Sequence, residues 1–156
     1  MDKEKAIKIL EFYRTIDKDV QFNMRIINDL EDRYYSGIRA TVIDGLPKGK
    51  GNTPSTVEIA VWNIPETVFN TLKELREQNR KLCELKTEIL KEINTLNHVS
   101  RVIIISFYIE GQQWAQITGQ VHYSERQCKN IRDNALEKLC VQFSKNKIIS
   151  TYKFPK

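Results

Sequence analysis

Residues 111–139 read GQQWAQITGQVHYSERQCKNIRDNALEKL, and this stretch carries the strongest indication of the fold. Its pattern predicts two helices joined by a tight turn, with the second helix opening at Ser124. Ser124 and Gln127 form a capping box, in which each side chain bonds the backbone N–H of the other residue. Tyr123 and Cys128 occupy the two positions of a hydrophobic staple, which would fix how the chain enters the helix.

The second predicted helix has one apolar face and one polar face. Its apolar residues recur at spacings of three and four, as in a buried helical stripe, and they are Cys128, Ile131, Ala135 and Leu139. In the preceding helix Trp114 and Ile117 are expected to be buried, with Val121 in the turn. The polar face carries Glu125, Arg126, Gln127, Lys129, Asn130 and Arg132. Because such side chains bond base edges or neutralise phosphates, the pattern predicts a helix-turn-helix that reads DNA.

This pattern resembles the promoter-reading region 4 of sigma-70 factors. The matching positions are Gly111, Trp114, Ile117, Val121, Ser124, Cys128, Ile131, Ala135, Leu136 and Leu139. The whole chain is more closely similar to phage-encoded late transcription regulators of the RinA/ArpU type, in which helices and an LP-x-G-x-G linker precede the same motif. Here the linker reads LPKGKG at residues 46–51. The resemblance implies activation of phage or prophage late genes in a bacterial host cell.

Two positions depart from the pattern of these families. Thr118 stands where a small Ala usually lets the two helices approach. His122 stands where the turn usually has Gly. Because His tolerates a positive φ better than most residues, we expect the turn to be kept.

The net charge of +5 is unevenly distributed along the chain. Residues 1–97 contain 16 Lys and Arg and 16 Asp and Glu, whereas residues 98–156 contain 9 and 4. The whole surplus therefore lies in the part with the predicted helix-turn-helix, as expected of a domain that binds a polyanion.

The cysteines and the hydropathy of the chain indicate the cellular compartment of the protein. Three cysteines, Cys83, Cys128 and Cys140, give an odd number without paired spacing, which favours a reducing cytoplasm over a disulfide framework. No apolar run approaches the roughly 18 residues of a membrane span, and the first residues lack the apolar core of a signal peptide. We therefore expect a cytoplasmic protein with no membrane partner.

Residues 3–35 are predicted to form one long helix, ending at Ser36-Gly37. Its apolar residues follow a heptad seam with Asn23 as the polar exception, and they are Ala6, Ile9, Tyr13, Ile16, Val20, Ile27, Leu30 and Tyr34. The seam fits either a helix of the same chain or a second copy of it. We favour the first, and a homo-oligomer through the N-terminal helices remains the alternative.

Residues 38–54 are predicted to be a flexible linker, because glycines and prolines cluster there. The Walker spacing of a phosphate loop is absent, so we favour a plain linker, and after it a basic arm along DNA. A helix with a second capping box is expected from Ser55, and Pro65 begins another that runs to about Leu96. The apolar face of this last helix is interrupted by Asn79 and Lys86.

Residues 100–110 read SRVIIISFYIE and suit a buried strand or a buried helix equally by periodicity. We choose a helix, because no partner strand is evident and Gly111 would cap a helix well. The expected fold is thus all-α. Residues 1–97 form a helical scaffold or oligomerisation part, 98–143 a helix-turn-helix domain and 144–156 a basic tail.

The sequence offers no pattern for catalysis, for a metal or for a cofactor. Its two histidines, His98 and His122, are isolated, and neither a paired C-x-x-C nor a nucleophile motif is present. An enzyme is therefore not expected, and the helix-turn-helix remains as the functional site.

The predicted partner of that site is double-stranded DNA. Arg126, Gln127 and Asn130 are assigned to base edges. Glu125 would accept from a cytosine, and Lys129 and Arg132 would contact phosphates. Ser124 begins the reading helix, while Gln112 and Gln113 would meet the DNA backbone through side chains and free N–H groups.

Two other functions remain open from the sequence. One is a phage DNA-packaging recognition subunit, which would form a ring. The other is a sigma-like adaptor that binds host RNA polymerase instead of DNA.

Overall fold

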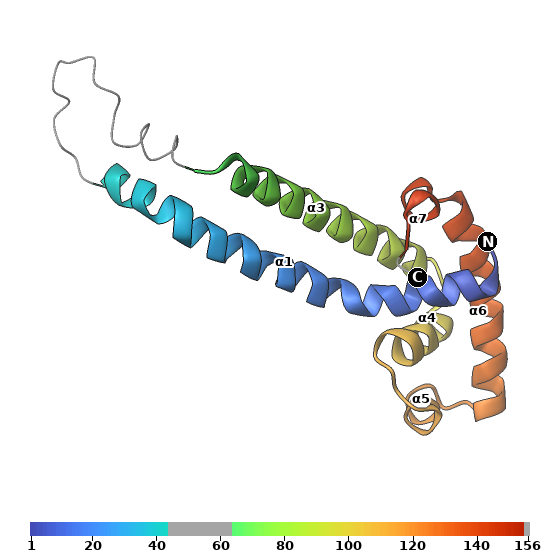
Figure 1. The fold of residues 1–156 in the computed structure, drawn as a ribbon. Coiled ribbons are helices and arrows are strands. Elements are labelled where there is room, and N and C mark those ends of the chain that lie inside the picture. The colour runs from blue at the N-terminus through green and yellow to red at the C-terminus, as the bar shows by residue number, and fades with distance from the viewer. Residues whose placement is uncertain (44–63, 155–156) are drawn as a thin grey trace, which may run out of the picture. The chain divides into compact units, whose positions relative to one another are not determined.

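A computed structural model of the chain describes residues 1–43 and 64–154, with the side chains of 36–43 excepted. The linker at 46–51 and the helix predicted from Ser55 lie outside this range. The described residues are arranged in helices with no strand among them, so the predicted all-α fold is confirmed (Figure 1).

The contacts divide the chain into two compact units. Unit 1 combines Met1–Lys18 with Leu82–Lys156, and unit 2 is Asp19–Lys81. This division crosses the boundary predicted at residue 97, since the start of the chain packs in the same unit as the helix-turn-helix.

Two long helices contribute to both units. Helix α1 spans Lys3–Ile43 and α3 spans Glu66–Asn94. The predicted end of the first helix at Ser36-Gly37 is wrong, because α1 continues through it. A glycine inside a helix costs about 1 kcal/mol relative to alanine, which neighbouring turns can outweigh. Helix α3 ends at Asn94, within two residues of its predicted end at about Leu96.

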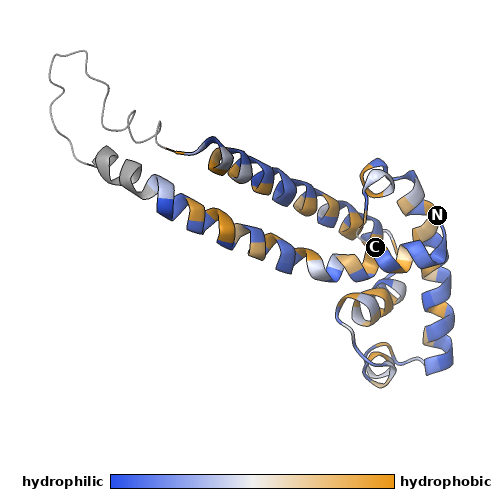
Figure 2. Ribbon diagram, viewed as in Figure 1, coloured by the Kyte–Doolittle hydropathy of each residue, from blue (hydrophilic) through white to orange (hydrophobic). Residues whose placement is uncertain are grey.

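Unit 2 is held by a small apolar cluster between α1 and α3. Ile27, Val68 and Leu72 are buried in it. The partly buried residues packed against them are Leu30, Tyr35, Ile64 and Leu75. Tyr34, the last residue of the predicted seam, is 40% exposed instead. Figure 2 shows hydrophobic positions alternating with hydrophilic ones along both helices, as amphipathic helices require.

Unit 1 contains the shorter helices as well as the ends of α1 and α3. After α4 (His98–Ile104), five residues form a π-helix, η1 (Ile105–Ile109). Then follow α5 (Trp114–Val121), α6 (Glu125–Lys145) and α7 (Lys147–Thr151). The choice of helix for 100–110 is therefore confirmed. Gly111 follows η1 with a φ of 70°, which redirects the chain towards α5.

The first residues of the chain are bonded to α6. The amino terminus donates to the Ser144 hydroxyl over 2.6 Å, and Lys3 Nζ lies 2.9 Å from a Glu137 carboxylate oxygen. Buried apolar side chains come from every long helix of unit 1 and include Ile9, Leu10, Leu85, Ile89, Ile93, Ile103, Leu139 and Phe143. The core that supports the helix-turn-helix is therefore built from both ends of the sequence.

The segment predicted as a basic tail is also packed in unit 1. Asn146 caps α7 by accepting from the N–H groups of Ile148 and Ile149. Its amide nitrogen lies 2.8 Å from carboxylate oxygens of Glu88 and Glu92 on α3. The signal that could have indicated this short helix is the Asn immediately before KIIST.

Candidate nucleic-acid interface

The turn between α5 and α6 forms as the sequence predicts. His122 adopts the left-handed conformation, with φ 58° and ψ 32°, at the turn position where a positive φ is expected. Ser124 is the N-cap of α6 in an extended conformation. Its backbone N–H donates to Gln127 Oε1 over 3.2 Å, and the Gln127 N–H donates to Ser124 Oγ over 3.4 Å. The capping box is therefore confirmed.

A compact apolar cluster fixes α5 and α6 together. Ile103, Ile117 and Cys128 are buried in it. The residues packed against these three are Val99, Phe107, Trp114, Val121 and Ile131. Burial raises the pKa of the Cys128 thiol, so the side chain serves as a small apolar group. Tyr123, the other half of the predicted staple, is 42% exposed, and the Cys128 thiol contacts its backbone carbonyl.

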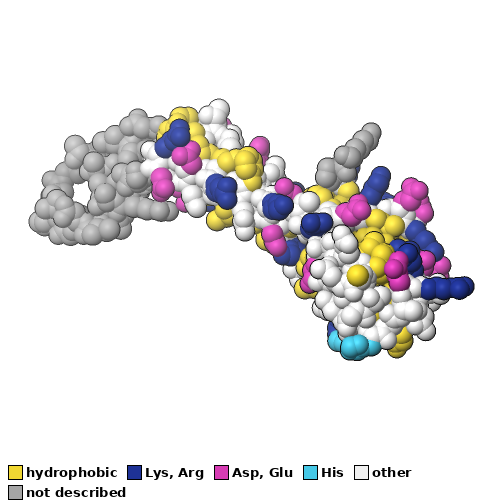
Figure 3. All heavy atoms as spheres, turned by 90° about the horizontal axis from the view of Figure 1, so that it is seen from below, with side chains coloured by type: hydrophobic (Ala, Val, Ile, Leu, Met, Phe, Trp, Pro, Cys, Tyr) yellow, Lys and Arg dark blue, Asp and Glu magenta, His cyan; other side chains and the backbone are white. Residues whose placement is uncertain are grey.

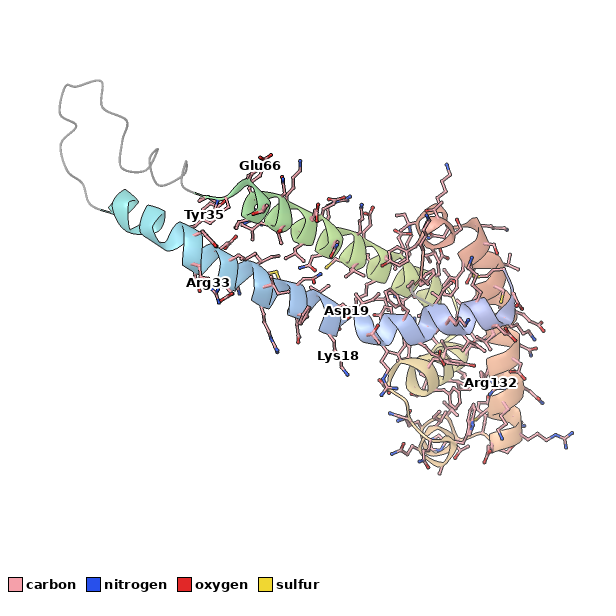
Figure 4. All side chains as sticks on the ribbon, in the orientation of Figure 1. Lys18, Asp19, Arg33, Tyr35, Glu66 and Arg132 are labelled. Atoms are coloured by element: carbon pink, nitrogen blue, oxygen red, sulfur yellow. The ribbon has the colours of Figure 1, made fainter. Side chains whose placement is uncertain are left out.

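An aromatic stack under α6 holds the guanidinium of Arg132. The rings of Phe107 and Trp114 stack with centroids 4.5 Å apart. The Arg132 guanidinium lies 5.5 Å from the Trp114 centroid and 5.8 Å from that of Phe107. Two of its nitrogens also donate to one Asp133 carboxylate oxygen, at 2.9 and 2.7 Å. This side chain, labelled on α6 in Figure 4, is only 23% exposed and is engaged with the protein.

The remaining residues assigned to DNA on α6 are exposed, but they differ in what they bond. Gln127 is used by the capping box. Lys129 lies 2.7 Å from Glu125 and 5.8 Å from the Trp114 ring centroid. Within the described part of the chain, no side-chain hydrogen bond or ion pair engages Arg126 or Asn130. These two are the side chains on the first turns of α6 that are free to bond a ligand.

The two glutamines that precede α5 are more engaged than the sequence suggested. The Gln112 N–H donates to the Ser106 carbonyl of η1 over 2.8 Å, and its side chain bonds Glu110 and Gln120. The Gln113 N–H donates to Gln116 Oε1 over 3.1 Å. Both backbone N–H groups are thus satisfied inside the motif, and the Gln113 side chain is exposed at the start of α5.

Charge alone does not mark the interface. Figure 3 shows basic and acidic side chains interspersed on the face it presents, instead of a field of one sign. The candidate site is therefore defined by the two unpaired side chains on α6 and by the rigid support below them.

The described ranges 1–43 and 64–154 hold neither a cluster of metal ligands nor a membrane-spanning helix. No three His, Cys, Asp or Glu side chains in them are grouped to hold a metal ion. Among these residues there is also no helix with the length and apolar character of a membrane span. No family model matches the chain, nor does any curated protein or solved structure.

Proposed function

We propose that this protein is a sequence-specific double-stranded DNA-binding transcription regulator that activates phage or prophage late genes in the cytoplasm of a bacterial host. The observation that carries the proposal is the pair Arg126 and Asn130. They are four residues apart, so they share one face of α6, and both are exposed and unpaired beside a rigid turn. Arg pairs with guanine and Asn with adenine through two hydrogen bonds each.

In this proposal the first turns of α6 enter the major groove, as the second helix of such motifs does. Arg126 and Asn130 bond base edges, and Gln127 joins them by leaving its cap. Lys129 contacts a phosphate after releasing Glu125, which can then accept from a cytosine. Breaking this exposed ion pair costs little, since such pairs are worth about 0–1 kcal/mol.

One residue takes a different role in the proposal than the sequence suggested. Arg132 is stacked on Trp114 and bonded to Asp133, so we assign it to holding α6 against α5 instead of to a phosphate. The proposal includes neither a catalytic step nor a cofactor. Host RNA polymerase is a second partner that an activator requires.

The proposal is tested by selecting bound sequences from a pool of random duplexes. We expect a consensus site that contains a guanine and an adenine contacted by α6. The double variant Arg126→Ala/Asn130→Ala should lose this preference but keep the wild-type melting temperature. A pool without enrichment, or a variant that enriches the same consensus, would refute the reading surface. Retention of RNA polymerase after nuclease treatment, without enrichment, would instead favour the adaptor.

A further inference from the structure

A hollow of about 480 Å³ lies in unit 1, outside the helix-turn-helix. Lys5 and Lys8 of α1 line one side of it, and residues 150–154 line the other. The two sides come from opposite ends of the sequence. The hollow therefore exists only in the folded unit.

The C-terminal side of the hollow is held in place by aromatic contacts. Phe12 of α1 lies 5.8 Å from Tyr152 and 5.5 Å from Phe154, measured between ring centroids. Tyr152 and Phe154 lie 4.9 Å from each other. These three rings fix Lys153, which stands between two of them in sequence, beside the first turns of α1.

The hollow is lined by positively charged side chains and by no negatively charged one. Lys5, Lys8 and Lys153 line it, and no acidic residue does. Within the part of the chain that the structure describes, no ion pair engages these three ammonium groups. By contrast, Lys3 and Lys86 of the same unit each bond a carboxylate. Three like charges held together by the fold repel one another, and a bound polyanion would relieve that repulsion.

The hollow lies well apart from the first turns of α6, where the proposed reading residues are. Lys3 of α1 is bonded to Glu137 of α6, and the amino group of Met1 is bonded to Ser144 of α6. Glu137 and Ser144 follow Glu125 by 12 and 19 positions, or about 18 and 29 Å along the helix. A small anion at one place cannot reach the other. A duplex can, because one turn of DNA spans about 34 Å.

We infer that the hollow of Lys5, Lys8 and Lys153 is a second, sequence-independent site for backbone phosphates of the nucleic acid that α6 reads. This inference rests on the proposed function and adds a contact that carries affinity without selecting sequence. It also assigns a role to the packed C-terminal segment, which brings Lys153 to α1.

The test compares two variants of the full chain with the same change of charge. Lys5→Gln/Lys8→Gln/Lys153→Gln removes the hollow charges, and Lys18→Gln/Lys138→Gln/Lys145→Gln removes three unit 1 charges outside it. Binding of the selected duplex is measured against salt concentration. We expect the hollow variant to reduce the salt slope by about 2 to 3, since each phosphate contact contributes about 0.9. It should enrich the same consensus, and the control should change the slope by less than about 1.

Each other outcome is decisive. An unchanged slope in the hollow variant, with an unaltered melting temperature, overturns the inference whatever the selection returns. If the selection returns no consensus but the hollow variant still reduces the salt slope of duplex binding, the inference about the hollow stands and the proposed function is overturned. Tripolyphosphate is the probe for a small ligand. If the hollow variant loses tripolyphosphate binding but keeps the duplex slope, the site takes small phosphates and not nucleic acid.

Discussion

Asn23 Nδ2 donates a hydrogen bond to Asn79 Oδ1 over 2.9 Å between α1 and α3 of unit 2. Each residue is a polar interruption of the apolar face of its helix. Asn79 is only 8% exposed, and its own amide nitrogen has no partner within the described residues. A single partly buried amide pair can fix the register of two helices, because a shift would break the hydrogen bond and leave the Asn79 amide without a partner.

Replacing one member of this pair should destabilise unit 2 more than replacing both. Asn23→Leu leaves the Asn79 carboxamide buried without a partner, at a cost of about 1–3 kcal/mol. Asn23→Leu/Asn79→Leu removes both groups and should recover most of that loss. Thermal unfolding measures the difference, with the exposed Asn28→Leu as the control expected to change little. A double variant less stable than the single would contradict this account.

Arg126→Ala should weaken binding of the selected duplex by about 1–3 kcal/mol and relax the preference at one base pair. The side chain is exposed and unpaired, so the melting temperature of the free protein should not change. Binding to the consensus and to single-base substitutions of it measures the effect. Asn134→Ala, exposed further along α6, is the matched control. Equal losses on every sequence would assign Arg126 to a phosphate.

Arg132→Gln separates a positioning role from a phosphate contact. Loss of the stack on Trp114 and Phe107 should cost about 1 kcal/mol, or about 2–4 °C in melting temperature. The salt slope of DNA binding should stay the same. Lys129→Gln is the comparison, since it should lower the slope by about 1 and leave the melting temperature nearly unchanged. A lower salt slope with an unchanged melting temperature for Arg132→Gln would instead assign Arg132 to a phosphate contact.

The left-handed residue of the turn should be sensitive to branching at Cβ. His122→Val places a β-branched side chain at a φ of 58° and should destabilise unit 1 by more than about 1 kcal/mol. His122→Gly should be at least as stable as the wild type, because Gly adopts this conformation freely. Denaturant titration measures both. If His122→Val were as stable as His122→Gly, the turn could adopt another conformation.

The three thiols should differ in reactivity. Cys83 is exposed, whereas Cys128 and Cys140 are buried and burial raises the pKa of both. We expect one fast-reacting thiol in the folded protein and three after unfolding, counted with a chromogenic disulfide reagent. The raised pKa values of the two buried thiols also make the stability of the protein depend on pH. Their contribution to stability is full below about pH 9 and falls as the pH rises, because only the unfolded thiols then ionise readily. Cys83→Ser should remove the fast phase alone.

The sequence by itself determined the features that depend on neighbours within one or two helical turns. The capping box of Ser124 and Gln127, the left-handed His122 and the stripe through Cys128 all follow from such local interactions. The end predicted at Ser36-Gly37 failed because glycine is a weak stop signal when the flanking turns are helical.

Tertiary structure alone decided which side chains meet across long separations. It paired Asn23 with Asn79, turned Arg132 onto Trp114, and brought Lys153 beside Lys5. Each pairing depends on how whole helices pack, which periodicity does not encode. A pattern of residues therefore placed Arg132 and Arg126 on one polar face, and only packing distinguished the engaged side chain from the free one.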